Sequence, residues 1–388
     1  MVNMRCPGLN RGDMDRKLRR MMMICCAALV CGFVSGVGQA SAEEGGVTVD
    51  PDGTVHVSDL ALPPSSYWSP QFKAAFIKQA RGALAAGSYT QPAPNAPRTE
   101  WNAFDARCRA GAAGTLKWER ANYPVEVVEG RMNGVAVASV VPRAGIAARD
   151  AHRVLIELHG GSCGGFDGET EAIPVAYFGR LKVLVVDYRP APRYAYPASV
   201  EDVVAVYKAL IGRYKPTAIG IFGTSGGGML TSEVLSWLQA EGLPRPGAAG
   251  IFWSGIMAAP YPWGHFGDSL TWELGGIPRP NHTVYRRLIA QLSQYMKGVK
   301  ANDPRAYPGS SDEVLRKFPP TLFLTGTRAV DLSSAVTSDA RLLTLGVDAD
   351  LYVMEGGWHA SSYGTDGSPE ERHVNEYITR WFESHLSP

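Results

Sequence analysis

The stretch IGIFGTSGGGML, residues 219–230, decides which fold the chain adopts. Its first residues, Ile219 to Phe222, form a short apolar run typical of a buried strand. The residues after it place apolar side chains at helical spacing, at Met229, Leu230, Val234, Leu235 and Leu238. Between the two, Gly223-Thr224-Ser225-Gly226-Gly227 fits Gly-x-Ser-x-Gly, and a sharp strand-to-helix turn needs glycines there because β-carbons would collide. The stretch predicts Ser225 on such a turn, at a helix N-terminus that favours negative charge.

Apolar runs on both sides of this stretch predict further strands of a sheet covered on both faces. They are Val154–Leu158, Val183–Val186, Ala248–Trp253, Thr321–Leu324 and Asp350–Met354. Amphipathic helical patterns lie between them, for example over residues 200–211 and 374–381. Upstream, valine-rich runs from Tyr123 to Val140 surround Asn133-Gly134, a strong hairpin signal. The alternation predicts an α/β fold with a mostly parallel, doubly wound sheet, and the hairpin adds two antiparallel strands.

The first 42 residues do not belong to this pattern. Basic residues from Arg16 to Arg20 precede an apolar stretch from Met21 to Val37, and Ala40-Ser41-Ala42 then offers small residues for cleavage. This order is typical of a secretory signal peptide. We therefore expect residues 1–42 to be a signal peptide and the protein to be exported, either periplasmic or secreted. The apolar stretch is short for a membrane span and nothing similar follows, so no stable membrane anchor is expected.

The remaining chain divides into two predicted parts. Residues 43–120 are interpreted as an N-terminal lead-in and cap helices, with a loose lead-in over 43–64 and a helix from Ser69-Pro70 to about Ala86. Residues 121–388 are interpreted as the α/β domain. An insertion after the sixth strand region, about residues 258–311, interrupts the alternation with Trp and Tyr residues. Together with the N-terminal helix, this insertion is expected to form a cap over a pocket.

Composition restricts the class of partner. With 45 % hydrophobic residues among 388, the chain can bury a large core. It contains 38 Lys and Arg against 37 Asp and Glu, without a basic run suited to a phosphate backbone, so no nucleic acid partner is expected. Cys108 and Cys163 are the cysteines outside the first 42 residues, and whether they pair stays open. No Cys or His spacing fits a metal site, no cofactor is expected, and the oligomeric state is not fixed.

A second match makes the serine motif ambiguous by itself. Gly160-Gly161-Ser162-Cys163-Gly164 also follows a predicted strand, but residues 165–168 continue it as a loop and no helix opens there. Preceded by His159, it is a flexible turn whose backbone N–H groups can stabilise an oxyanion. Gly160, Gly161, Ser162 and Gly226 are therefore the candidate oxyanion-hole residues. His159 is expected to hold the turn by hydrogen bonds, and nothing in the sequence activates Cys163 as a nucleophile.

Three motifs occur in order along the chain. They are His159-Gly160-Gly161, then Asp187-Tyr188-Arg189-Pro190-Ala191-Pro192 with Tyr196-Pro197-Ala198, then Gly223-Thr224-Ser225-Gly226-Gly227. From about Tyr123 to the C-terminus the chain closely resembles the hormone-sensitive-lipase branch of bacterial α/β-hydrolase carboxylesterases. The resemblance implies an α/β-hydrolase fold in which an acid and a histidine follow the serine along the chain. The corresponding stretches are Gly326-Thr327-Arg328-Ala329-Val330-Asp331 and Glu355-Gly356-Gly357-Trp358-His359-Ala360.

His359 is the candidate base and Asp331 the candidate acid. His359 lies in a glycine-bearing loop after the last predicted strand, whereas His373 and His385 fall on the final helix. Sequences of this branch often carry the acid directly after Gly-Thr-Arg, so Ala329-Val330 displace Asp331 along the chain. Two alternatives remain open at this point. Asp339 is a poorer candidate for the acid, and Asp331 is alternatively the cap of a helix that begins near Ser333.

These residues together predict a reaction class. A serine hydroxyl becomes a nucleophile when a base takes its proton, an acid orients the base and N–H groups stabilise the oxyanion. We expect a serine hydrolase that cleaves small-molecule carboxylic esters of short to medium acyl chain, or lactones, with the ester class implied by the resemblance. Hydrolysis of amides or peptides by the same residues is the first alternative. A catalytically inactive hydrolase fold that serves as a binding protein is the second.

Overall fold

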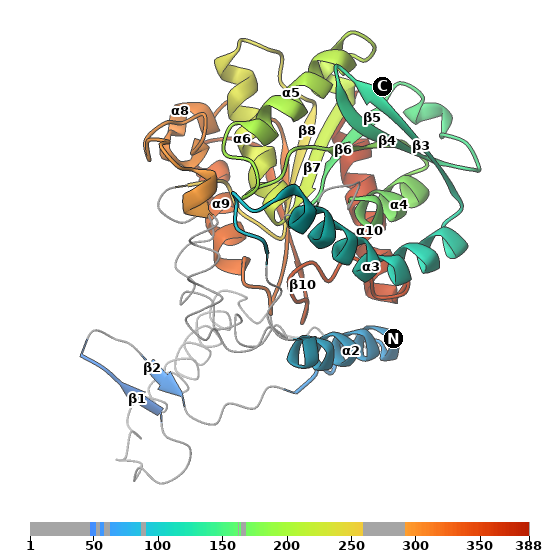
Figure 1. Ribbon diagram of the computed structural model, residues 1–388, viewed down its shortest axis with the longest axis vertical. Helices are drawn as coiled ribbons and strands as arrows, with labels where there is room; N and C mark the ends of the chain where they lie inside the picture. The colour runs from blue at the N-terminus through green and yellow to red at the C-terminus, as the bar shows by residue number, and fades with distance from the viewer. Residues whose placement is uncertain are drawn as a thin grey trace, which may run out of the picture. The chain divides into compact units, whose positions relative to one another are not determined.

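The computed structural model describes residues 47–51, 55–57, 63–86, 91–161, 163, 168–258 and 292–387 (Figure 1). The described chain separates after Pro63 into two units. The first contains a short antiparallel pair, β1 (Val47–Val49) and β2 (Val55–Val57). The prediction of a loose lead-in over residues 43–64 was therefore wrong in this part. Two runs of alternating valines flank an Asp-Pro-Asp-Gly turn sequence, and such runs pair as a hairpin. The predicted signal peptide lies outside the described residues.

An eight-stranded sheet forms the centre of the second unit. Its strands are β3 (Val125–Met132), β4 (Val135–Pro142), β5 (Val154–Leu158), β6 (Lys182–Asp187), β7 (Ile219–Thr224), β8 (Ala248–Phe252), β9 (Thr321–Gly326) and β10 (Ala349–Met354). Their order across the sheet is β10-β9-β8-β7-β5-β6-β4-β3. The strands from β10 to β6 are parallel, and β4 runs antiparallel to both β6 and β3. The predicted α/β fold with a mostly parallel sheet and a hairpin at Asn133-Gly134 is confirmed.

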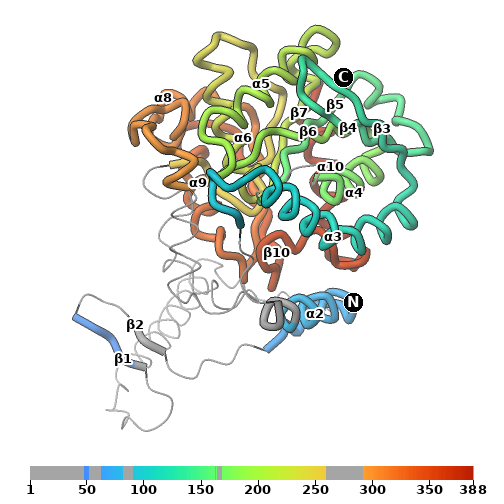
Figure 2. The backbone as a smooth tube through the Cα atoms, viewed as in Figure 1, coloured from blue at the N-terminus to red at the C-terminus, as the bar shows by residue number. Residues whose placement is uncertain are grey.

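Helices cover both faces of this sheet, as Figures 1 and 2 show. One face packs against α5 (Ala198–Ile211), α6 (Gly226–Ala240) and α9 (Leu332–Thr344), and the other against α4 (Glu169–Gly179) and α10 (Pro369–His385). Successive strand residues point to opposite faces, so Val154, Ile156 and Leu158 of β5 enter the first core and Leu155 enters the second. Two further helices are α3 (Arg98–Asn122), which packs on α4, and the short α8 (Asp312–Leu315).

The predicted N-terminal helix is present as α2 (Pro70–Ala86). Ser69 caps it, because its Oγ accepts a hydrogen bond from Phe72 N at 3.2 Å. Most of the predicted insertion, residues 259–291, lies outside the described residues. The cap that this insertion is expected to form stays a prediction. Among the described residues, we find no helix of the length and apolarity that a membrane span requires.

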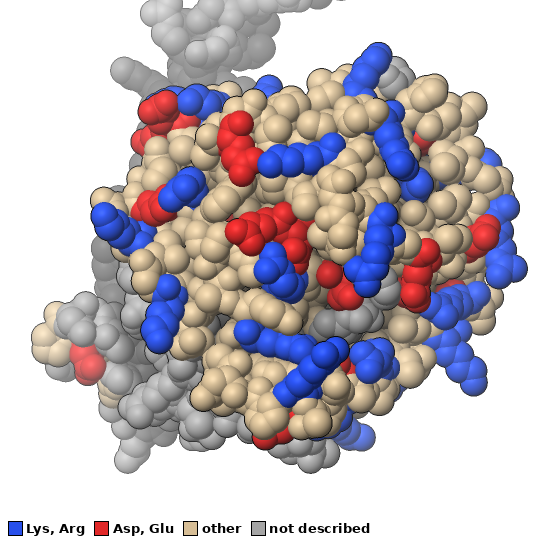
Figure 3. All heavy atoms as spheres, turned by 45° about the horizontal axis from the view of Figure 1, so that its top comes forward, with Lys and Arg blue, Asp and Glu red and all other residues tan. Residues whose placement is uncertain are grey.

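Figure 3 shows one face of the molecule with its charged side chains. On this face the basic and acidic side chains of the described residues are interspersed, and neither sign gathers into one large region. A protein that binds a nucleic acid backbone usually presents a contiguous basic surface. The expectation that nucleic acid is not a partner stays a prediction, and this face gives no reason to change it.

Candidate active site

Ser225 lies on the sharp turn between β7 and α6, as the sequence predicts. Its backbone has φ 55° and ψ −115°, a conformation that a residue with a side chain rarely adopts. The turn is fixed by a hydrogen bond from Ser225 N to Phe252 O of β8 (2.8 Å). A β-carbon on Gly223 would lie 2.3 Å from Gly227 O, and one on Gly227 would lie 1.8 Å from Leu158 O. These contacts explain why the turn requires both glycines of the motif.

His359 approaches Ser225 from the loop after β10. Its Nε2 lies 3.0 Å from Ser225 Oγ, and its Nδ1 lies 2.6 Å from Asp331 Oδ1. The structure therefore brings together the predicted nucleophile, base and acid, although they are 134 and 28 residues apart along the chain. The competing His373 and His385 lie on α10.

Asp331 is fully buried and oriented by a second contact. Thr325 Oγ1 donates a hydrogen bond to Asp331 Oδ2 at 2.7 Å, so each carboxylate oxygen has a partner. The residue occupies the N-cap position of α9, but its side chain makes no capping hydrogen bond. The alternative in which Asp331 only caps this helix is therefore wrong. Ala329 and Val330, which displace Asp331 along the chain, are absorbed in a buried turn closed by Ala329 N and Gly326 O (3.0 Å).

The loop of His359 is braced by aromatic side chains that the sequence did not single out. Trp358 is buried and its ring lies 4.7 Å from the ring of Phe72 and 6.2 Å from that of Trp68. Trp68 Nε1 also donates a hydrogen bond to Glu355 O at 3.0 Å. The described residues at the start of α2 thus hold the histidine loop in place. Spacing of Trp68, Phe72 and Phe76 by four residues signals a helix face, but not which loop it contacts.

The candidate oxyanion residues lie directly beside the serine turn. A β-carbon on Gly226 would lie 3.6 Å from Gly161 O and 3.8 Å from Gly161 N, so the two glycines are neighbours. Gly161 has φ +70°, a conformation that favours glycine. Gly160 faces the carbonyl of Thr224. Ser162 lies outside the described residues, so its predicted role is not placed.

Gly160 provides a test of this arrangement. A β-carbon there would lie 2.8 Å from Thr224 O and 3.2 Å from Ser225 Cβ, so Gly160→Ala must displace the loop from the serine turn. We expect kcat for an ester to fall by about 10²-fold, the usual cost of losing one oxyanion donor. Steady-state kinetics measure this, with Gly130→Ala as a control because no atom lies within 4 Å of that β-carbon. Wild-type kcat in Gly160→Ala would contradict the placement.

His159 holds the oxyanion loop, in agreement with the prediction that it is not the base. Its ring is buried, stacks on Tyr188 at 4.3 Å and contacts Gly160 O through Nδ1 at 2.9 Å. Tyr188 OH donates a further hydrogen bond to His159 O at 2.6 Å. The loop before Gly161 is therefore fixed from the ring side and from the backbone side.

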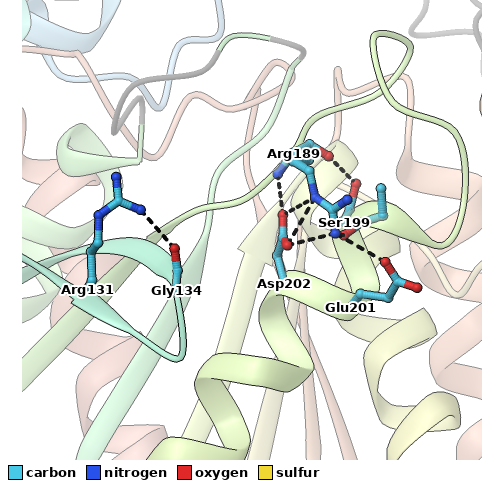
Figure 4. Close-up of polar contacts among 7 residues, drawn as sticks. Arg131, Gly134, Arg189, Ser199, Glu201 and Asp202 are labelled. Atoms are coloured by element: carbon cyan, nitrogen blue, oxygen red, sulfur yellow. Dashed lines mark hydrogen bonds and ion pairs between the residues drawn. The ribbon is translucent and has the colours of Figure 1, made fainter.

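The segment that carries Tyr188 is itself anchored to α5 (Figure 4). Arg189 donates to both oxygens of Asp202, at 2.9 to 3.1 Å, and Ser199 Oγ donates to Arg189 O at 2.6 Å. The backbone N of Arg189 also donates to Asp202 at 2.9 Å. The Asp187-Tyr188-Arg189 motif thus acts as a scaffold that positions the ring against His159.

Cys108 and Cys163 form a disulfide bond. This pairing, which the sequence left open, connects α3 to the loop that follows the oxyanion glycines. Around it, Trp101 and Phe104 of α3 form a small apolar cluster with Cys108, against which Cys163 packs. Cys163 is therefore no free thiol nucleophile in this structure, and the disulfide holds the loop two residues after Gly161.

Removal of this disulfide is expected to lower both stability and activity. It closes a separation of 55 residues, for which the loop-entropy relation gives about 4 kcal/mol. The double variant Cys108→Ser with Cys163→Ser should therefore lose about 2 to 4 kcal/mol of unfolding free energy, measured by urea denaturation. Its kcat should also fall, because the oxyanion loop loses an anchor. Unchanged unfolding free energy in the double variant would contradict the prediction.

A small cavity of about 60 Å³ opens beside the serine turn. Gly161 and Gly226 line one part of it, apolar side chains such as Leu230 and Met257 line its walls, and Glu233 and Tyr295 are also part of the lining. Glu233 is not among the site residues predicted from the sequence, because a charged residue within a helical pattern is usually exposed. The cavity connects the candidate oxyanion residues to a buried polar pair.

Among the described residues, one group has the geometry to share a metal ion. Donor atoms of Asp348, Asp350 and His385 lie within 4.8 Å of one another. The group lies at the beginning of β10, whereas His359 lies in the loop that follows the other end of this strand. Asp350 already accepts a hydrogen bond from Trp381 Nε1 at 2.6 Å. Nothing in this position connects the group to Ser225.

A family model described as alpha/beta hydrolase fold matches residues 155–362, a span that includes Ser225, Asp331 and His359. The carboxylesterase/phospholipase LipF of Mycobacterium tuberculosis is 26 % identical over 275 residues, which cover 65 % of this chain and 69 % of LipF. Esterase LipU of the same organism is 25 % identical over 312 residues, covering 77 % of this chain and 97 % of LipU.

Solved structures agree with the sequence matches. The crystal structure of an esterase called E25 superposes with a TM-score of 0.68 and 28 % identity, covering 85 % of this chain and 98 % of that one. An esterase from the bacterial hormone-sensitive lipase family gives a TM-score of 0.64 at 23 % identity, covering 82 % of this chain and 99 % of that one. At 23 % identity the second likeness concerns the fold alone.

Proposed function

Because this chain belongs to the α/β-hydrolase fold family and is an esterase-type hydrolase, we propose that it cleaves carboxylic esters by transferring the acyl group to Ser225. The observation that carries the proposal is the unbroken contact from Ser225 Oγ to His359 Nε2 (3.0 Å) and from His359 Nδ1 to Asp331 Oδ1 (2.6 Å). A neutral histidine held in this way has Nε2 free to accept the serine proton.

In the first step, Ser225 Oγ attacks the ester carbonyl carbon while its proton passes to His359 Nε2. Asp331 accepts the hydrogen bond from Nδ1–H and stabilises the imidazolium that forms. The tetrahedral oxyanion is stabilised by backbone N–H groups of Gly161 and Gly226 and by the N-terminus of α6. The C–O bond to the alcohol then breaks, and the alcohol leaves with the proton that His359 returns.

In the second step, water replaces the alcohol. His359 takes a proton from the water, the resulting hydroxide attacks the acyl carbon, and a second tetrahedral intermediate forms at the same donors. Collapse of this intermediate returns the proton to Ser225 and releases the carboxylic acid. His359 carries the proton in both steps.

The substrate class is proposed from the cavity and the relatives. Carboxylic esters of short to medium acyl chain, or lactones, fit a small cavity with mostly apolar walls. The names carboxylesterase and esterase of LipF and LipU favour esters over amides. A catalytically inactive binding protein is disfavoured, since the contacts among Ser225, His359 and Asp331 are complete.

We further propose that the protein works outside the cytoplasm. Residues 1–42 have the order of a signal peptide, and the Cys108–Cys163 disulfide suits an oxidising compartment. The insertion near residues 258–311 is proposed to cap the site. Its aromatic residues are suited to an apolar wall.

A panel of substrates tests the proposed function. The purified protein is assayed with p-nitrophenyl esters of increasing acyl length, with lactones and with p-nitroanilides of the same acyl groups. We expect turnover of esters to exceed that of the matched anilides, with the highest kcat/KM for short acyl chains. Turnover of anilides with no ester hydrolysis would overturn the ester assignment. Absence of turnover on the whole panel would favour the inactive binding protein.

A further inference from the structure

The cavity beside the serine turn contains a carboxyl group that the proposed reaction does not use. Glu233 lies in α6 with 1 % of its surface exposed. Its Oε2 accepts a hydrogen bond from Tyr295 OH at 2.8 Å, while its Oε1 is buried and has no hydrogen-bond partner among the described residues. Burial of an unsatisfied polar atom costs free energy unless a ligand supplies the missing partner. Because Glu233 is one of the residues that line the cavity, its unpaired oxygen is the group that a bound molecule would need to satisfy.

The position of Glu233 along α6 sets its distance from the reacting atoms. Gly226 begins the helix, Leu230 follows about one turn later and Glu233 about two turns later, and all three line the cavity. At 1.5 Å per residue, Glu233 lies ~10 Å along the axis from Gly226, and side chains tilt back toward the helix N-terminus. The carboxyl therefore lies closer to the oxyanion donors than this axial distance, a gap that an acyl chain of about three carbon atoms together with a hydrogen bond would span.

We expect the acyl part of an ester to be the part that enters this cavity. The leaving alcohol must lie near His359, because that residue returns its proton. The described lining includes Gly161 and Gly226 but no residue of the His359 loop. The chain bonded to the carbonyl carbon, on the side of the oxyanion donors, therefore points toward Glu233.

The surroundings of Glu233 make it a donor at neutral pH. Burial raises its pKa to about 8, against a smaller lowering by the Tyr295 hydrogen bond. The titratable groups that face it are Tyr295, Tyr196 and Tyr307, and burial raises the pKa of each of these phenols, so they stay neutral. Among the described residues, no cation contributes to the pKa of Glu233. Below pH 8 the carboxyl is protonated, and Oε1–H is available to donate while Oε2 accepts from Tyr295.

We propose that Glu233 selects esters whose short acyl chain carries a hydroxyl or carbonyl oxygen about three carbon atoms along the chain. This inference rests on the proposed ester hydrolysis and names its substrate class. An unsubstituted acyl chain would leave Oε1 buried and unpaired, and sites of this kind discriminate strongly against substrates that lack the matching polar group. Glu233 is thus a specificity residue and takes no part in proton transfer to Ser225.

The test compares three ethyl esters, the butyrate, the 3-hydroxybutyrate and the acetoacetate, by the ethanol that each releases. For the wild type at pH 7, we expect kcat/KM for the two oxygenated esters to exceed that for the butyrate by about tenfold or more. In Glu233→Leu, this ratio should fall to about the ratio of the esters' intrinsic reactivities. Glu241→Gln, an exposed change beside the C-terminal end of the same helix, should keep the wild-type ratio.

The pH dependence separates the donor from a merely structural carboxyl. Above pH 8, ionised Glu233 accepts hydrogen bonds but donates none, so the preference for the acetoacetate is lost while the preference for the hydroxy ester remains. Glu233→Gln keeps an N–H donor and does not titrate, so its acetoacetate preference should not change between pH 7 and pH 9. This variant also decides the question if Glu233→Leu fails to fold.

Equal kcat/KM for all three esters in the wild type would overturn the inference. Ratios that are the same in the wild type, in Glu233→Leu and in Glu233→Gln at both pH 7 and pH 9 would also overturn it. Both outcomes still require ester hydrolysis. Failure of the proposed function is a different result, in which none of the three esters is hydrolysed and a fluorophosphonate does not modify the protein.

Discussion

Replacement of Ser225 by alanine is expected to lower kcat for p-nitrophenyl butyrate by about 10⁴-fold or more. The reason is that no other described hydroxyl lies within hydrogen-bond distance of His359 Nε2, so the acyl-enzyme cannot form. KM should change little, because alanine leaves the cavity and the oxyanion glycines intact. Steady-state kinetics with the variant at high concentration measure the residual rate.

The second serine motif supplies the control for this variant. Ser162→Ala retains the backbone N–H that we expect to serve the oxyanion, so it should lose less than about tenfold in kcat. If Ser162→Ala instead abolished turnover and Ser225→Ala did not, the nucleophile would lie in the other motif. Both variants should melt at nearly the wild-type temperature, which circular dichroism checks.

Replacement of Asp331 by asparagine is expected to reduce kcat by about 10⁴-fold with little change in KM. The amide fills the same buried space, but its NH₂ group donates to Nδ1 and favours the histidine tautomer with a proton on Nε2. That nitrogen then cannot accept the proton of Ser225 Oγ, at a distance of 3.0 Å. Rates measured from pH 6 to pH 9 should stay low throughout.

Asp339 is the matched control, because it was the other candidate for the acid. It lies on α9 eight residues after Asp331, and burial raises its pKa. Asp339→Asn should change kcat by no more than about twofold, since no contact connects its carboxyl to His359. A large loss in Asp339→Asn together with an active Asp331→Asn would contradict the assignment of the acid.

The sheet and the serine turn could be predicted from sequence because local patterns determine them. A buried strand needs a run of apolar residues, and the turn at Ser225 needs glycines where any β-carbon would collide with Leu158 O or Gly227 O. The hairpin at Asn133-Gly134 follows from two residues with positive φ. In each case the cause lies within a few residues of the element.

Asp331 shows where local pattern becomes insufficient. The sequence placed it near the right turn, but the capping alternative could be dismissed only when Thr325 and His359 were seen to engage both oxygens. The competing capping role depends on helix geometry within one turn, whereas the contact with His359 joins two strands. Asp331 and His359 follow β9 and β10, and they meet because these two strands are neighbours in the sheet.

Features that depend on packing between distant segments were not predicted. The contact of Trp68 and Phe72 with Trp358, and the burial of Glu233 against Tyr295, join parts of the chain that no short motif connects. The pairing of Cys108 with Cys163 belongs to the same class, since spacing alone could not place α3 beside the oxyanion loop. These contacts hold the catalytic loops and shape the cavity, so they bear on specificity more than on reaction type.

Covalent labelling with a fluorophosphonate tests the central claim most directly, because the reagent phosphonylates a serine, with loss of fluoride, only when a base activates it. Intact mass and peptide mapping are recorded for the wild type and for Ser225→Ala after the same exposure. The assignment of Ser225 as the nucleophile predicts one adduct per wild-type molecule, located on the peptide that contains Ser225, and none in Ser225→Ala. A wild type that takes no label, or a Ser225→Ala variant that is labelled to the same extent, would contradict it.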